Sequence, residues 1–151
     1  MQCRYIDAVY CDDIREEIRN KFSYMGIYNG ELNVPQAPIV LPKLCVAVKI
    51  VTDIKDPISS LEVRVLSGNE EVELINTGRL PGVPDTSIFD SSTKMLTLQL
   101  NFVMSPFQID RDTVLRVKAR TEREGEELQA PGLRIRVVPP DGQTPNSGTE
   151  L

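Results

Sequence analysis

The feature that most constrains the fold is the strict alternation of apolar and polar residues in six short runs. In the run 60–66, Leu61, Val63 and Val65 fall on one face while Glu62 and Arg64 fall on the other. The same period of two recurs in residues 43–51, 71–75, 94–102, 112–120 and 133–137. Such alternation is typical of strands with one buried and one solvated face. We therefore predict an all-β fold, an antiparallel β-sandwich of about seven to eight strands.

The segments between these runs suggest how the chain is organised. A length of 151 residues suits one domain, which we place at residues 1–138. Residues 139–151 are rich in Pro, Gly and polar residues, which predicts a flexible, disordered C-terminal tail. Three prolines in residues 35–42 predict an extended crossover rather than a strand. Residues 76–94 show no clear periodicity and predict a long loop, either functional or disordered.

Composition argues against several classes of function. The chain has no histidine, which removes the commonest general base and a common zinc ligand. Cys3, Cys11 and Cys45 show no C-x-x-C spacing, so we expect reduced thiols in a cytoplasmic protein, and no cofactor. A net charge of −5 disfavours nucleic acid as a partner. No apolar run is long enough for a membrane span and no signal peptide is evident, so we expect no membrane association.

The stretch CDDIREEIRNKFSYMGIY, residues 11–28, admits two local structures. As a helix, Asp12 or Asp13 caps the N-terminus, and Ile14, Ile18 and Phe22 share one face. As a hairpin, two strands are joined by a turn at residues 19–21, where asparagine suits a left-handed conformation. The periodicity alone slightly favours the helix.

The same stretch resembles the signature of an uncharacterised family of small bacterial and phage or prophage proteins, a domain of unknown function. The matching residues are Cys11, Asp12, Asp13, Ile14, Arg15, Glu17, Asn20, Lys21, Ser23, Gly26 and Tyr28, followed by residues 41–45. The resemblance implies a compact β-rich domain and favours the hairpin over the helix. It brings no established activity with it.

Acidic residues suggest one alternative function. The acids of residues 12–17 alternate between two faces of a hairpin and surround Arg15, so they are poorly placed to converge on a metal ion. Loop acids at the ends of a sandwich are better placed. The alternative is thus a calcium- or substrate-binding sandwich domain, with a hydrolase as one form of it, using Asp53, Asp56, Asp85 and Asp90.

Basic residues suggest the leading function. The outward positions of two neighbouring runs are Arg116, Lys118, Arg120, Arg134 and Arg136. Adjacent like charges cost free energy, so such a face either binds an acidic partner or is balanced by acids such as Glu62, Glu71 and Glu73.

We predict a non-enzymatic protein-binding module that uses this basic face and the long loop, represented by Arg79, Asp85 and Phe89. The resemblance points to a partner in the bacterial host, including a defence protein, or to another copy in an assembly, with a virion component as a further possibility.

Overall fold

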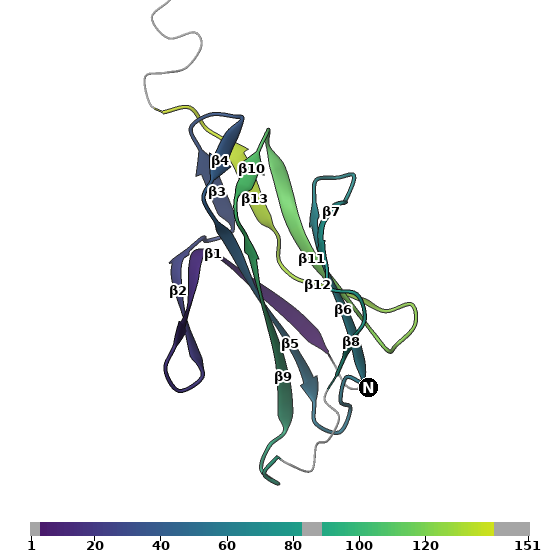
Figure 1. Ribbon diagram of the computed structural model, residues 1–151. Coiled ribbons are helices and arrows are strands. Elements are labelled where there is room, and N and C mark those ends of the chain that lie inside the picture. Colours follow the sequence, from purple (N-terminus) through teal and green to yellow (C-terminus); the bar gives the residue numbers. More distant parts are fainter. Residues whose placement is uncertain (1–3, 83–88, 141–151) are drawn as a thin grey trace, which may run out of the picture.

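The computed structural model describes residues 4–82 and 89–140, which form two large facing β-sheets, a β-sandwich, and a small two-stranded sheet (Figure 1). The predicted all-β fold is confirmed. In the described ranges the strands are β1 (Tyr5–Glu17), β2 (Lys21–Ile27), β3 (Glu31–Val34), β4 (Ile39–Leu41), β5 (Leu44–Asp53), β6 (Ser60–Ser67), β7 (Val72–Asn76), β8 (Leu80–Pro81), β9 (Met95–Met104), β10 (Phe107–Ile109), β11 (Thr113–Thr121), β12 (Glu127–Gln129) and β13 (Leu133–Val137). The thirteen segments outnumber the seven to eight expected strands because β3, β4, β8, β10 and β12 have only two to four residues each.

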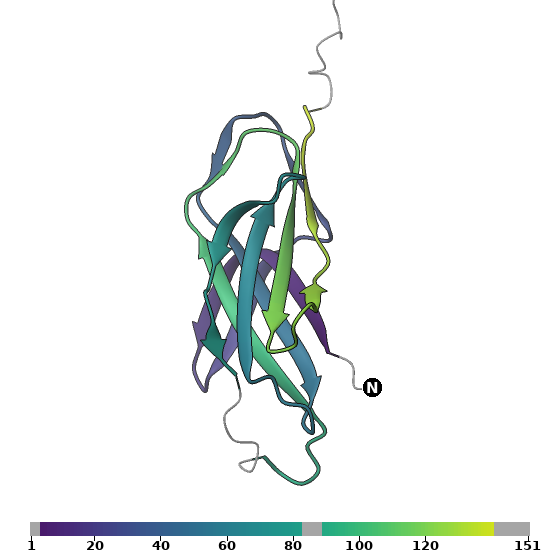
Figure 2. The same cartoon turned by 90° about the vertical axis from the view of Figure 1, so that its right-hand side faces the viewer.

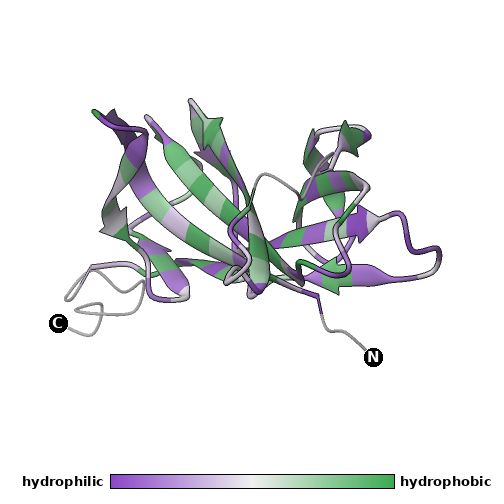
Figure 3. Ribbon diagram, turned by 90° about the horizontal axis from the view of Figure 1, so that it is seen from below, coloured by the Kyte–Doolittle hydropathy of each residue, from purple (hydrophilic) through white to green (hydrophobic). Residues whose placement is uncertain are grey.

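The first sheet is antiparallel and has the order β2-β1-β5-β9. Strand β5 lies inside it, and its core-facing side chains, Leu44, Val46, Val48 and Ile50, are fully buried. Their neighbours along the chain face the other side, where Lys49 is exposed and Cys45, Ala47 and Val51 are also buried. Hydrophobic and hydrophilic bands alternate along much of the two sheets (Figure 3). The alternation in residues 43–51 therefore marks a real strand.

The second sheet has the order β3-β13-β11-β6-β7, with β12 beside β11 and β8 beside β6. Its inner face completes the core, and Val63, Val65, Leu115, Val117 and Ile135 are all fully buried. Figure 2 shows this sheet turned toward the viewer.

One pair in the second sheet departs from the predicted antiparallel arrangement. Strand β3 pairs in parallel with β13, and Leu32 lies beside Ile135. The four residues of β3 are too few for their alternation to stand out in the sequence. Their partner is also about a hundred residues away along the chain, so no local turn announces the pairing.

Two predicted connections contain strands. The proline-rich crossover 35–42 was expected to exclude a strand, which is wrong for Ile39–Leu41, because β4 pairs with β10. The prolines flank these three residues without removing their N–H groups. The long loop 76–94 is likewise interrupted, since Leu80 of β8 pairs with Leu61 of β6.

Parts of two predicted segments lie outside the described residues. These are 83–88 of the long loop and 141–151 of the predicted tail. Residues 4–82 and 89–140 contain no helix long and apolar enough to cross a membrane.

Candidate protein-contact surfaces

Strand β1 takes part in two successive pairings along its 13 residues. From Tyr5 to Cys11 it pairs with β5, whereas from Asp13 to Glu17 it pairs only with β2. The second part forms a β-hairpin that stands to one side of the sandwich (Figure 1). The hairpin expected from the family resemblance is confirmed, and the helical alternative is wrong.

The hairpin turn explains the residues at its tip. Glu17 is paired with Lys21, so the turn contains three residues, and two of them, Arg19 and Asn20, have φ values of 67° and 57° in the left-handed region. Three-residue hairpin loops commonly contain a residue in that region. Asparagine tolerates this conformation better than most residues, which accounts for Asn20, while Lys21 opens β2 opposite Glu17.

At the base of the hairpin, signature residues lock the chain in place. The Tyr28 hydroxyl donates a hydrogen bond to the Asp12 carboxylate. Gly26 has a φ of 68°, and a Cβ atom there would overlap the same carboxylate. Asp13 accepts from Lys43 Nζ at 3.0 Å, and this pairing holds the pKa of the Asp13 carboxyl below its ordinary value. The positive φ favours glycine at this position, and a side chain there would also displace the Asp12 carboxylate, so this part of the signature is structural.

The acids of the signature do not converge on one point. Glu17 accepts a hydrogen bond of 2.8 Å from the Ser23 hydroxyl across the hairpin. Arg15 donates to the Met25 sulfur at 3.8 Å on the same face. Asp12 and Asp13 are engaged separately at the base, with Tyr28 and Lys43 as described above. The signature therefore shapes a hairpin and does not form a cluster of ligands.

The hairpin exposes large apolar side chains. Ile18 at the tip is 78% exposed, and Phe22, Met25 and Ile27 on β2 are 41%, 45% and 59% exposed. Sequence analysis did not select these residues. A signal was present, because apolar residues fall on both faces of this short strand, Phe22 on one and Met25 and Ile27 on the other. A strand that packs on the core with one face usually carries polar residues on the other, so apolar residues on both faces indicate an exposed apolar surface.

Two cysteines lie opposite each other on β1 and β5. Cys11 and Cys45 are fully buried, free thiols. Burial, followed by the neighbouring thiol, raises the pKa of Cys11 to about 11, and burial also raises the pKa of Cys45. Because the thiolate is the reactive form, neither side chain is poised as a nucleophile.

The five predicted cations share the outer face of the second sheet, but acids occupy much of that face. Lys118 forms ion pairs with Glu71 and, at 3.6 Å, with Glu127. Glu127 on β12 also lies 3.2 Å from Arg120 and 2.9 Å from Arg64. Sequence analysis named Glu71 as a balancing acid but missed Glu127, which sits in a three-residue strand without a clear pattern.

The remaining basic side chains lie apart from this network. Arg136 pairs with Glu31 at 3.6 Å, and Arg116 donates to the Gly68 carbonyl at 3.1 Å. Arg134 and Arg136 line a hollow of about 800 Å³ between the β6–β7 turn and the β10–β11 connection. Arg79 and Arg120 line another, of about 580 Å³, beside the β11–β12 turn. The predicted basic face is thus divided between two ends of the sheet.

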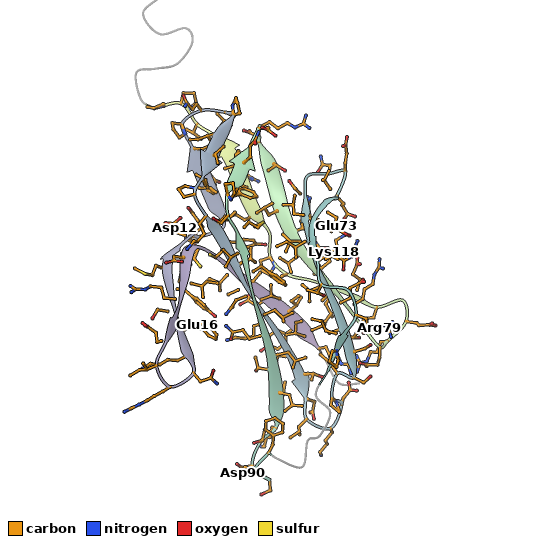
Figure 4. The ribbon with its side chains drawn as sticks, in the orientation of Figure 1. Asp12, Glu16, Glu73, Arg79, Asp90 and Lys118 are labelled. Atoms are coloured by element: carbon orange, nitrogen blue, oxygen red, sulfur yellow. The ribbon has the colours of Figure 1, made fainter. Side chains whose placement is uncertain are left out.

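Figure 4 shows how the candidate surfaces are distributed. Asp12 and Glu16 lie on the hairpin at one side, whereas Glu73, Lys118 and Arg79 lie on the opposite side, and Asp90 lies at the lower end. Phe89, the predicted contact residue beside Asp90, is 38% exposed. Asp85 lies outside the described residues.

The acids of the calcium alternative are held by other groups. Asp53 accepts from the Lys55 N–H at 2.7 Å, and Asp90 accepts from the Ser92 N–H at 2.6 Å. The carboxylate of Asp56 is shared by Arg4 and Arg123. Within residues 4–82 and 89–140, no three acidic or cysteine side chains are grouped so that they could hold a metal ion.

A buried arginine is the least expected polar feature of the sandwich. The Arg4 side chain is 1% exposed and forms ion pairs with Asp56 at 3.2 Å and Glu122 at 2.6 Å. It also donates to Thr52 of the first sheet at 3.3 Å and to Thr121 of the second at 3.0 Å. Arg4 therefore joins the two sheets. A single arginine before the first strand gives no sequence signal for such a role.

Comparisons with known proteins place the chain in a family without supplying an activity. No curated protein matches it. The model of a family of unknown function (DUF6941) matches residues 6–136, and the chain therefore belongs to that family.

Proposed function

We propose that this protein is a non-enzymatic protein-binding module whose principal contact element is the β1–β2 hairpin. The observation that carries the proposal is the exposure of apolar side chains on both faces of the hairpin, with Ile18 at the tip, Phe22 on one face, and Met25 and Ile27 on the other. Aromatic residues and methionine are enriched at the centres of protein interfaces. The hairpin holds them on a two-stranded arm that is fixed at its base, so little conformational freedom is lost on binding.

The charges around these side chains suit a polar rim. Arg15, Glu17, Arg19 and Lys21 flank the apolar side chains and include both signs. A mixed rim of this kind contributes orientation and specificity more than affinity. We therefore propose a folded protein as the partner, with an apolar depression at its centre.

The basic face has a secondary role in this proposal. Lys118 and Arg120 already pair with Glu71 and Glu127, so much of their charge is neutralised locally. Arg134 has no ion pair with any residue in the ranges 4–82 and 89–140, and it keeps its charge available on that face. Such a site would steer an acidic protein more than anchor it.

The proposed setting is the bacterial cytoplasm. The resemblance of the signature to phage and prophage proteins supports a host protein as partner, with defence proteins as one class. The absence of histidine and the raised pKa values of Cys11 and Cys45 support binding in place of catalysis.

The test is a capture experiment from bacterial lysate with matched baits, followed by binding measurements with the purified captured protein. The hairpin bait carries Ile18→Ser and Phe22→Ser. The control bait carries Val40→Ser and Val138→Ser, which remove exposed apolar side chains elsewhere. Truncating an interface anchor typically costs about 1–2 kcal/mol or more. We expect at least a tenfold loss of affinity for the hairpin variant and none for the control.

A second variant separates the two surfaces. Arg116→Glu, Arg120→Glu and Arg134→Glu reverse the basic face while leaving the hairpin unchanged. We expect this variant to slow association and to change its salt dependence with a smaller effect on dissociation. Equal affinity of the wild-type and hairpin variants would refute the hairpin as the contact element.

A further inference from the structure

Strand β9 ends the first sheet with an open edge. Within residues 4–82 and 89–140, no strand pairs with the side of β9 that faces away from β5. Its ten residues, Met95–Met104, include no charged residue and no proline. Natural sheets usually protect such edges with lysine, proline, bulges or short strands. The other end strands of the two large sheets, β2, β3 and β7, are shorter, at four to seven residues, and each carries a charged residue, namely Lys21, Glu31 and Glu73.

A second observation concerns the core-facing side of β9. Leu98, Leu100 and Phe102 point toward the core but are only partly buried. Their partners on β5 in the same register, among them Val48 opposite Leu100, are fully buried. The apolar face of the sheet therefore extends to the open edge, where its side chains remain partly exposed to solvent. One more strand at this edge would bury these side chains.

We propose that β9 pairs with β9 of a second copy of this chain, antiparallel, about a twofold axis at Gln99. Inward-facing and outward-facing residues match across such a pair only when the pairing is centred on a residue. Centring on Gln99 places polar residues beside polar ones and apolar residues beside apolar ones on both faces. The pairs are Gln99 with Gln99, Thr97 with Asn101, Met95 with Val103, Leu98 with Leu100, and Leu96 with Phe102.

The sequence of the strand argues for a second copy as the occupant. A twofold interface is self-complementary, so any charge near its axis meets a like charge. Strand β9 has no charge to repel its own copy. Centring the pair on Leu100 would instead place Thr97 opposite Val103 and match polar with apolar residues. Pairing at Gln99 joins the two four-stranded sheets into one continuous eight-stranded sheet.

This inference goes beyond the proposed function and is independent of it. Strands β2 and β9 occupy opposite ends of the strand order, but the Gln99 side chain donates a hydrogen bond to Tyr24 of β2, so the hairpin reaches the proposed axis. A dimer through β9 would place two hairpins beside the same axis and double the number of contact elements. Two linked contact elements raise avidity for a multivalent partner without any new contact.

The first test is the molar mass of the full chain in solution, by light scattering and by sedimentation over a range of concentrations. We expect a dimer of twice the 16.9 kDa monomer for the wild type. Gln99→Lys places two ammonium groups at the twofold axis, so we expect its dimer to dissociate at concentrations at least tenfold higher than the wild type needs. A monomeric wild type throughout would overturn the proposal.

Two controls isolate the charge at the axis. The Gln99 side chain also donates a hydrogen bond to the Tyr24 hydroxyl, and Tyr24→Phe removes this bond without adding charge. Gln129→Lys makes the same change on β12, in the other sheet. We expect both controls to dimerise as the wild type does. A dimer that withstands Gln99→Lys would also overturn the proposal.

Cross-linking tests the register directly. Residues directly opposite each other in an antiparallel pair have Cα atoms about 4.5–5.5 Å apart, within the range that disulfides span. We expect Gln99→Cys to give a covalent dimer on mild oxidation, and the wild type and Gln129→Cys to give none. A dimer that Gln99→Cys fails to cross-link overturns the proposed pairing, and binding through the hairpin would be unaffected by that result.

Discussion

Replacing Arg4 by methionine tests whether the buried arginine holds the two sheets together. Methionine keeps much of the length of the side chain and removes its charge and its five donors. The substitution breaks the hydrogen bonds and ion pairs that Arg4 makes with Asp56, Glu122, Thr52, Thr121 and the Pro57 carbonyl. The two carboxylates remain, and they lose the cation that faces them.

The size of the effect follows from the burial of these carboxylates. Removing one member of a fully buried ion pair costs about 3–5 kcal/mol, because the other charge stays uncompensated. The side chains of Asp56 and Glu122 are 26% and 31% exposed, so water can reach them in part. Asp56 also retains Arg123. We therefore expect Arg4→Met to lower the free energy of unfolding by about 3 kcal/mol, the lower end of that range.

The assay is equilibrium unfolding in urea, followed by circular dichroism. With a slope of about 2 kcal/mol per molar urea, a loss of about 3 kcal/mol moves the midpoint down by about 1.5 M. Arg123→Met is the matched control, since its side chain is 30% exposed, and we expect it to cost about 1 kcal/mol or less. The reasoning is refuted if Arg4→Met lies within about 0.5 kcal/mol of the wild type, or if the control costs more.

Three further predictions concern the glycines near the hairpin base, the stability of the protein at acidic pH and the reactivity of the thiols. Gly30→Ala should lower the free energy of unfolding by about 1 kcal/mol because of its positive φ alone. Gly26→Ala should lower it clearly more, because the added methyl group overlaps the Asp12 carboxylate. Equal urea midpoints for the two variants would contradict this. Burial raises the pKa of Glu122, but hydrogen bonds from a backbone N–H and an arginine outweigh burial and hold it below its ordinary 4.5. The stabilisation by the Glu122 carboxylate is therefore present above pH 4.5 and lost as the pH falls through its folded pKa. Glu122→Gln should make the free energy of unfolding fall less steeply at acidic pH, and an unchanged dependence on pH would count against this reasoning. Cys11 and Cys45 should resist iodoacetamide at about pH 8 until urea unfolds the chain, as read by peptide mass spectrometry, because burial raises both thiol pKa values; labelling of the folded protein would contradict this.

Where the chain alternates over five or more residues, the sequence predicted the strands well. The runs 43–51, 60–66 and 112–120 became β5, β6 and β11, because one face of each packs in the core. The other face carries charged residues on β6 and β11, whereas on β5 only Lys49 is exposed. The residue types also predicted the position of one turn correctly. The preference of asparagine for the left-handed region, together with the family resemblance, located the hairpin turn at Asn20.

The strands that the sequence missed are those whose partners lie far away along the chain. β3, β4 and β8 have two to four residues each, and pairing with distant strands fixes them, not their own periodicity. The prediction of the basic face was incomplete for a similar reason. Outward-facing cations were identified correctly on β11 and β13, but Glu127, which neutralises Lys118 and Arg120, comes from a short strand folded back beside them. Burial of Arg4 depends on three separate segments and has no local signature.

The parallel pairing of β3 with β13 sets the order in which this chain can finish folding. Glu31 lies beside Arg134, so β3 waits for a partner that leaves the ribosome about a hundred residues later. The β1–β2 hairpin, by contrast, pairs residues that are close in sequence. Closing a long loop carries a larger entropy loss than closing a short one. The hairpin is therefore placed to form while synthesis is under way, and β3 and β13 close the second sheet last.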